Sequence, residues 1–119
     1  MKGRMIILAL FLLSAQPLSS HRVCTPDEVY ADPVATIGCE VSLIGRVKKV
    51  ISVTMPMEFI IESDGCLFLV QYFMTGGAGA VPVKEGKGYR ITGTILGSRQ
   101  VVYEGSVSRI PSIYCTAIE

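Results

Sequence analysis

Four cysteines are the residues of this chain with the most evident chemistry, and their spacing favours disulfide bonds. They stand at Cys24, Cys39, Cys66 and Cys115. No two of them form a Cys-x-x-Cys pair, which argues against a thioredoxin-like redox motif and against a zinc site, where at least one close pair of ligands is usual. Two disulfides are therefore expected, in one of three possible pairings. We favour Cys24 with Cys39 and Cys66 with Cys115, and a Cys39–Cys66 bridge is the alternative.

Acid–base and nucleophilic catalysis would need side chains that this sequence does not group together. Its one histidine, His21, lies at the expected edge of signal cleavage and cannot be the buried, oriented imidazole of a catalytic triad. Glu58, Glu62 and Asp64 alternate along one expected strand, which is more typical of a solvated face than of a catalytic carboxylate pair. The glycine-rich stretch 76–80 lacks the lysine and the helix that follow a phosphate-binding loop. We predict no enzymatic activity, no metal site and no cofactor.

The first twenty residues have the three parts of a secretory signal peptide. Two basic residues precede an apolar run from Met5 to Leu13, and small residues follow. The run is much shorter than the roughly twenty residues that a membrane-spanning helix needs. We expect cleavage after Ala15 or Ser20, no membrane span afterwards, and export to the periplasm or the extracellular space, where disulfides persist.

After cleavage, the length of the chain indicates one small domain, and its composition lacks the excess of basic residues that is typical of nucleic-acid-binding proteins. Loss of residues 1–20 would leave 99 residues with nine basic and ten acidic side chains, a net charge of −1. Domains that bind nucleic acids usually carry a basic excess. We expect residues 21–39 to form an N-terminal segment and residues 40–119 to form the barrel with its C-terminal tail.

The alternation of apolar and polar residues after residue 40 predicts an all-β domain. A brief helix is expected to begin at Thr25, because this hydroxyl N-cap is followed by proline and two acids. Period-two patterning then predicts five strands, over residues 40–53, 58–63, 66–73, 89–96 and 99–110. Asp64-Gly65 and Gly97-Ser98 are the expected hairpin turns, and residues 111–119 the expected tail. Since closure removes the two exposed edges of a sheet, we predict a small closed barrel.

The order of these features resembles an OB-fold. Gly45-Arg46-Val47 stands in the first strand, an acidic-glycine turn separates the second and third strands, and a glycine-punctuated run from Lys84 to Ile95 leads into the last two. This order is similar to that of small exported bacterial OB-fold proteins and of tRNA-anticodon-binding-like OB domains, over residues 40–110. The resemblance implies a five-stranded OB-like Greek-key barrel. Two departures are the glycine-rich stretch in place of a helix after the third strand, and the four cysteines.

An OB barrel usually binds ligands on the outer face of its second and third strands. By this resemblance, the candidate ligand-binding residues here are Lys48, Lys49, Ile60, Glu62, Phe68, Tyr72 and Arg99. Aromatic side chains on such a face stack bases or sugar rings, but the acidic residues of this face would repel a phosphate backbone. We therefore predict a non-enzymatic binding module for a protein or a cell-envelope component. The alternatives are a single-stranded nucleic-acid-binding OB domain and a glycan-binding, toxin-like subunit that forms a ring.

Overall fold

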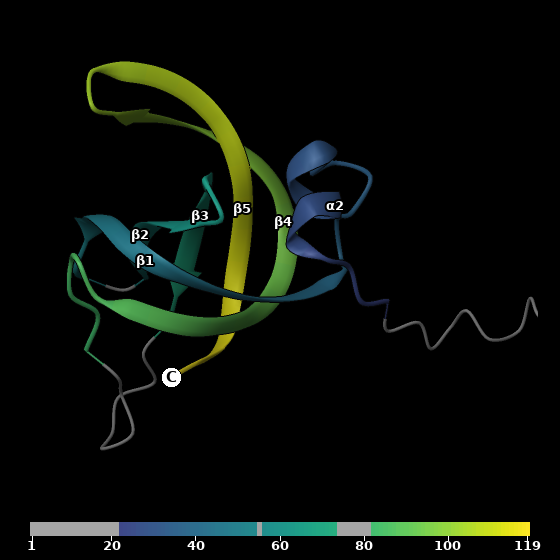
Figure 1. Cartoon of the computed structure of the whole chain (residues 1–119), viewed down its shortest axis with the longest axis horizontal. Coiled ribbons are helices and arrows are strands. Elements are labelled where there is room, and N and C mark those ends of the chain that lie inside the picture. The colour runs from purple at the N-terminus through teal and green to yellow at the C-terminus, as the bar shows by residue number, and fades with distance from the viewer. Residues whose placement is uncertain (1–21, 55, 74–81) are drawn as a thin grey trace, which may run out of the picture.

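The computed structural model describes residues 22–54, 56–73 and 82–119. The expected signal peptide, His21 and the glycine-rich stretch 76–80 lie outside these residues. The described chain forms one short helix and five strands (Figure 1): α2 Pro26–Ala31, β1 Glu40–Ser52, β2 Met57–Ser63, β3 Cys66–Tyr72, β4 Gly88–Tyr103 and β5 Ser106–Ile118. The predicted all-β class is confirmed. Within the described ranges, no helix has the length and apolar character needed to cross a bilayer.

The five strands close into a barrel in the order β1-β2-β3-β5-β4. Neighbouring strands are antiparallel except β3 and β5, which run parallel. Because β3 and β5 are parallel neighbours, the chain between them must cross from one end of the barrel to the other. The described part of this connection contains no α-helix. The small closed barrel of five strands that the sequence predicts is therefore present.

The barrel interior is filled by alternate residues of each strand, as the period-two pattern predicts. In β1, Val41, Leu43 and Val47 are buried in the main core, while their neighbours point outward. Gly45 occupies the remaining inward position, where a Cβ would lie 2.5 Å from the carbonyl oxygen of Glu62. The absence of a side chain at this position therefore allows β1 and β2 to approach closely.

The short helix forms where the sequence places it and packs on the core. The Thr25 hydroxyl accepts a hydrogen bond from the Glu28 amide, and the Thr25 amide donates to the Glu28 carboxylate at 2.8 Å, which together make a capping box. Val29 is fully buried, and the Tyr30 ring meets Phe68 edge-on with ring centroids 5.9 Å apart. These contacts hold α2 against the barrel, on the right in Figure 1.

The last hairpin differs from the sequence prediction. The predicted turn at Gly97-Ser98 is wrong, because β4 continues to Tyr103 and the chain turns at Glu104-Gly105, where both residues have positive φ. Gly97 lies instead at a register shift of the β4–β5 ladder, as in a β-bulge. The expected tail is also wrong, since residues 111–118 are the part of β5 that closes the barrel against β3.

Candidate binding surfaces

A long hairpin covers the face on which ligand binding was expected. Residues 98–111, here called the β4–β5 arm, extend beyond the part of β4 and β5 that pairs with β1 and β3. The arm bends over the side of the barrel that carries β2 and β3 (Figure 1). Its Val101 and Ile110 pack with Ile60 and Leu69 in a cluster separate from the main core. Ile60 and Leu69 are 0% exposed, although they point away from the barrel interior.

An ion pair joins the arm to the same face. Arg99 Nη1 lies 3.2 Å from Glu58 Oε2, and Gln71 Nε2 donates to the same oxygen at 2.8 Å. The Glu58 side chain is only 16% exposed, because the arm lies over it. Arg99 is half exposed, so the pair contributes only about 0–1 kcal/mol to stability. The ion pair therefore fixes the position of the arm on the β2–β3 face but adds little to the free energy of unfolding.

The other predicted ligand-binding residues are not gathered into one open face. Phe68 was expected on the outer face, but it is fully buried in the main core, because its position in β3 points into the barrel. Tyr72 is half-buried and packs against the same core. Glu62 pairs with Lys48 at 3.3 Å, and Lys49 is exposed beside them at a register shift of β1. The Phe68 and Tyr72 rings that were expected on the β2–β3 face therefore belong to the main core or pack against it.

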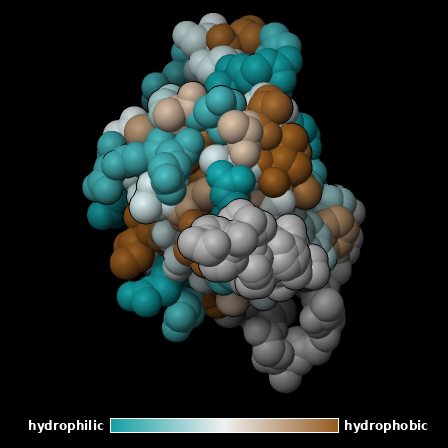
Figure 2. All heavy atoms as spheres, turned by 90° about the vertical axis from the view of Figure 1, so that its right-hand side faces the viewer, coloured by the Kyte–Doolittle hydropathy of each residue, from teal (hydrophilic) through white to brown (hydrophobic). Residues whose placement is uncertain are grey.

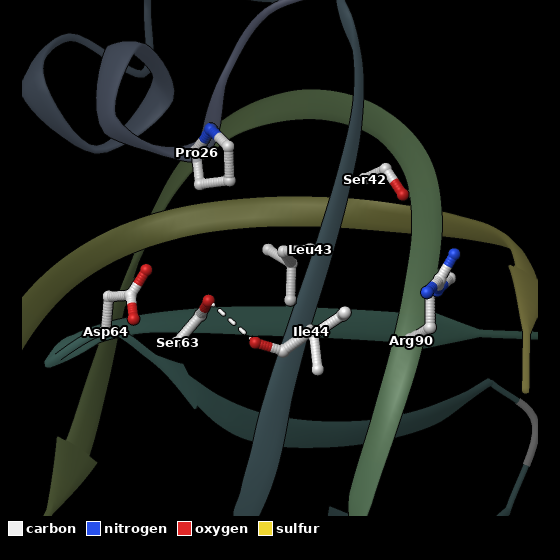
Figure 3. A pocket seen from close by; sticks show the side chains of 7 residues that line it. All are labelled: Pro26, Ser42, Leu43, Ile44, Ser63, Asp64 and Arg90. Atoms are coloured by element: carbon white, nitrogen blue, oxygen red, sulfur yellow. Dashed lines mark hydrogen bonds between the residues drawn. The ribbon is translucent and has the colours of Figure 1, made fainter.

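An open hollow lies on a different side of the barrel, on the outer face of β1 (Figure 3). Its volume is about 500 Å³, and its lining residues are Pro26, Ser42, Leu43, Ile44, Ser63, Asp64 and Arg90. The Ser63 hydroxyl donates to the Ile44 carbonyl oxygen at 2.8 Å, which ties the end of β2 to β1 beneath the hollow. Asp64 and Arg90 stand on opposite sides of Ile44 (Figure 3).

Sequence analysis did not find this hollow. Asp64 belongs to a hairpin turn, Arg90 belongs to β4, and they are far apart in the chain. The strand register is the signal that could have shown that they are close. Ile44 of β1 pairs with Arg90 of β4. The β1–β2 ladder pairs Arg46 with Glu62, and two residues further along it Ile44 lies opposite Asp64. That register depends on the glycine contact between β1 and β2, which only the folded barrel reveals.

The cysteines form one disulfide in the described structure. Cys24 and Cys39 are bonded, with their Cα atoms 5.9 Å apart, and this confirms the first predicted bridge. The second predicted bridge, between Cys66 and Cys115, is wrong, because both thiols are free. Cys115 lies beside Tyr72 in the β3–β5 register, six residues from Cys66 along β3. At about 3.3 Å per residue that is roughly 20 Å, far more than a disulfide spans.

The free thiols differ in their surroundings. Cys115 is buried in β5, and this burial raises the pKa of its thiol from 9.0 to about 11, although a hydrogen bond with the Ala117 backbone partly opposes the shift. Cys66 is half-exposed at the start of β3. Among the described residues, no three histidine, cysteine or acidic side chains are grouped closely enough to hold a metal ion.

Comparisons with known proteins identify no family. No protein-family model matches the sequence, and no curated protein matches it either. Two crystal structures of RecJ from Thermus thermophilus, with Mg²⁺ and with Mn²⁺, are similar to 68% and 69% of this chain, with TM-scores of 0.35 and 0.37 and 11% identity. The matched part is 11% of the RecJ chain. A likeness of this size supports no assignment of function.

Proposed function

We propose that this protein is an exported, non-enzymatic binding module whose ligand is a protein or another component of the cell envelope. The observation that carries the proposal is the β4–β5 arm on the β2–β3 face. Ile60 and Leu69 are buried beneath it, so bases or sugar rings have no open stacking surface there. Binding must then use other parts of the surface.

The remaining surface is better suited to a protein than to a polyanion. Residues 21–119 carry a net charge of −1, whereas affinity for nucleic acid rests on cationic contacts to phosphate. Exposed aliphatic side chains are found on the segment after α2, at Val34 and Ile37, and on the outer face of the arm, at Val102 and Val107. On the side of the molecule that carries α2, hydrophobic side chains stand in patches among hydrophilic ones (Figure 2). Such patches are common where proteins meet.

Two features support export. The Cys24–Cys39 bridge is of the kind that persists in oxidising compartments, and the basic and apolar pattern of residues 1–20 is typical of a cleaved signal. The bridge also holds the N-terminal segment to the start of β1, because Cys39 immediately precedes that strand.

The proposal is tested on the full chain produced in a secreting host. Intact-mass analysis of the exported material is expected to show loss of the first 15 or 20 residues. The purified protein is then offered oligo-dT and oligo-U at about 50 mM and 200 mM salt, a glycan array, and solubilised envelope from the native host with chemical cross-linking. We expect one envelope component to be cross-linked reproducibly, and neither oligonucleotide nor glycan to bind.

Three outcomes would contradict the proposal. Oligonucleotide binding that weakens steeply with salt would favour the nucleic-acid alternative. Glycan binding by a defined ring of subunits would favour the toxin-like alternative. An uncleaved leader on protein retained in the cytoplasm would remove the basis for an envelope ligand.

A further inference from the structure

We propose that the hollow on β1 binds an extended peptide segment that carries one basic and one acidic side chain, the basic one at Asp64 and the acidic one at Arg90. The inference rests on the proposed function as a protein-binding module, and it names the chemistry of the segment that this site recognises.

The two charges lie in one row across the sheet. Arg90 of β4 is the direct partner of Ile44 in β1, and the register of β1 with β2 brings Asp64 to the other side of Ile44. Strands are about 4.8 Å apart, so the Cα atoms of Asp64 and Arg90 are separated by about 10 Å. Figure 3 shows the carboxylate on one side of the hollow, the guanidinium on the other and Ile44 between them.

Neither charge is used within the described part of the fold. The acidic side chains on the β2–β3 face have cationic partners, since Glu58 pairs with Arg99 and Glu62 with Lys48. Asp64 and Arg90 are exposed, and neither forms an ion pair with another described residue. A ligand that carries both signs satisfies both residues, whereas a simple anion or cation would meet one attractive and one repulsive charge.

The floor of the hollow suits the stems of such side chains. Ile44 is 62% exposed in the middle of the row, and Pro26 adds apolar surface. Lysine and glutamate have aliphatic stems that lie along apolar surface while their charged ends stay in water. In an extended peptide, the Cα atoms of residues i and i+2 are about 7 Å apart and their side chains point to the same side. Long side chains at these two positions can therefore reach both Asp64 and Arg90.

The hollow also has the size and the polar groups of a binding site. Its volume of about 500 Å³ is within the usual range for ligand sites. The hydroxyl of Ser42 lies at its edge, 3.3 Å from the Thr92 hydroxyl, and this pair can rearrange to accept or donate a hydrogen bond to a peptide group.

The experiment is an NMR titration of the isotope-labelled full-length protein with short blocked peptides. The probe is acetyl-Lys-Ala-Glu-amide, and the matched neutral peptide is acetyl-Gln-Ala-Gln-amide. The site variants are Asp64→Asn, which keeps a residue that tolerates the positive φ of this turn, and Arg90→Gln. The matched controls are Glu104→Gln and Lys84→Gln, which remove the same charges from exposed positions outside the hollow.

We expect the charged peptide to shift the amide signals of residues 42–44, 63–65 and 90 in a saturable way, and the neutral peptide to leave them unchanged. Each site variant should weaken binding about two- to fivefold, as for loss of one exposed ion pair. The control variants should bind as the parent does. Thermal melts of all four variants establish that they are folded.

Two results would overturn the inference: equal binding of the charged and neutral peptides, or equal weakening by site and control variants. Its failure is separable from that of the proposed function. If the Asp64→Asn/Arg90→Gln double variant still cross-links the envelope component while the peptide does not bind, the module binds its partner elsewhere. If the parent protein cross-links no envelope component and the peptide does not bind, both proposals fail.

Discussion

The packing of the β4–β5 arm on β2 and β3 is tested by two neighbouring valines. Val101 is 8% exposed and lies in the cluster under the arm, whereas Val102 is 58% exposed on the arm's outer face. They are consecutive residues of the same strand that point to opposite faces, so Val→Ala removes the same two methyl groups from a covered and from an open position. The difference between the two variants therefore reports the burial of one valine by the arm.

The expected magnitude follows from the carbon atoms removed. Each substitution deletes two carbons, worth about 0.8 kcal/mol each when buried. Val101→Ala should then cost about 2 kcal/mol once a cavity term is added, while Val102→Ala should cost about 0.7 kcal/mol or less. For a domain of this size 1 kcal/mol shifts the Tm by about 4–8 °C, so Val101→Ala should lower the Tm by about 8 °C or more.

The assay is urea and thermal unfolding of the oxidised protein, followed by circular dichroism. A double-mutant cycle with Leu69→Ala adds a direct test of contact, since residues that touch show a coupling of about 0.5 kcal/mol or more. Equal effects of Val101→Ala and Val102→Ala, together with zero coupling to Leu69, would refute the packing of the arm. The β2–β3 face would then be open, and the main support for proposing a protein ligand over nucleic acid and glycans would be lost.

Other predictions follow from single contacts. Gly45→Ala should destabilise the protein by about 1–3 kcal/mol in thermal melts, because the new Cβ would lie 2.5 Å from the Glu62 carbonyl oxygen; an unchanged Tm would show that β1 and β2 are less close than described. Replacing both Cys24 and Cys39 by alanine should cost about 3 kcal/mol of unfolding free energy, as expected for a loop of this length, and a loss below about 1 kcal/mol would contradict a stabilising bridge. In the native protein a maleimide should label Cys66 quickly and Cys115 only after unfolding, since the first thiol is half-exposed and the second is buried; rapid labelling of both would contradict the burial of β5. Burial raises the pKa of the Cys115 thiol from 9.0 to about 11, so between these values the unfolded state loses this proton while the folded state keeps it. The free energy of unfolding should therefore fall as the pH rises from about 9 to about 11. In Cys115→Ala this fall should be smaller.

Local patterns in the sequence were sufficient for the first three strands and for one turn. Asp64-Gly65 forms the hairpin turn that its residue types indicate, with positive φ at both positions. The helix after Thr25 forms with the capping box that its residues encode. These predictions succeed because each depends on interactions between residues close in the chain.

The last hairpin shows where such patterns are insufficient. Gly97-Ser98 has better turn residues than Glu104-Gly105, yet the chain turns at the second pair. The turn position is decided by packing: continuing β4 past Gly97 lets Val101 reach Ile60 and Leu69, and it also brings residues 112–115 beside β3. Both gains come from contacts between distant segments, which turn propensity does not register.

The sequence by itself determined that this protein is a small all-β domain with a net charge close to zero and one short N-terminal helix. The alternation of apolar and polar residues, the helix cap and the composition can all be read without knowing which distant segments meet. Only the tertiary structure decided which side of the barrel stays open. The arm closes the β2–β3 face, strand register places Asp64 and Arg90 around Ile44, and the parallel pairing of β3 with β5 keeps Cys66 away from Cys115. Each of these outcomes depends on how strands far apart in the chain align across the closed barrel.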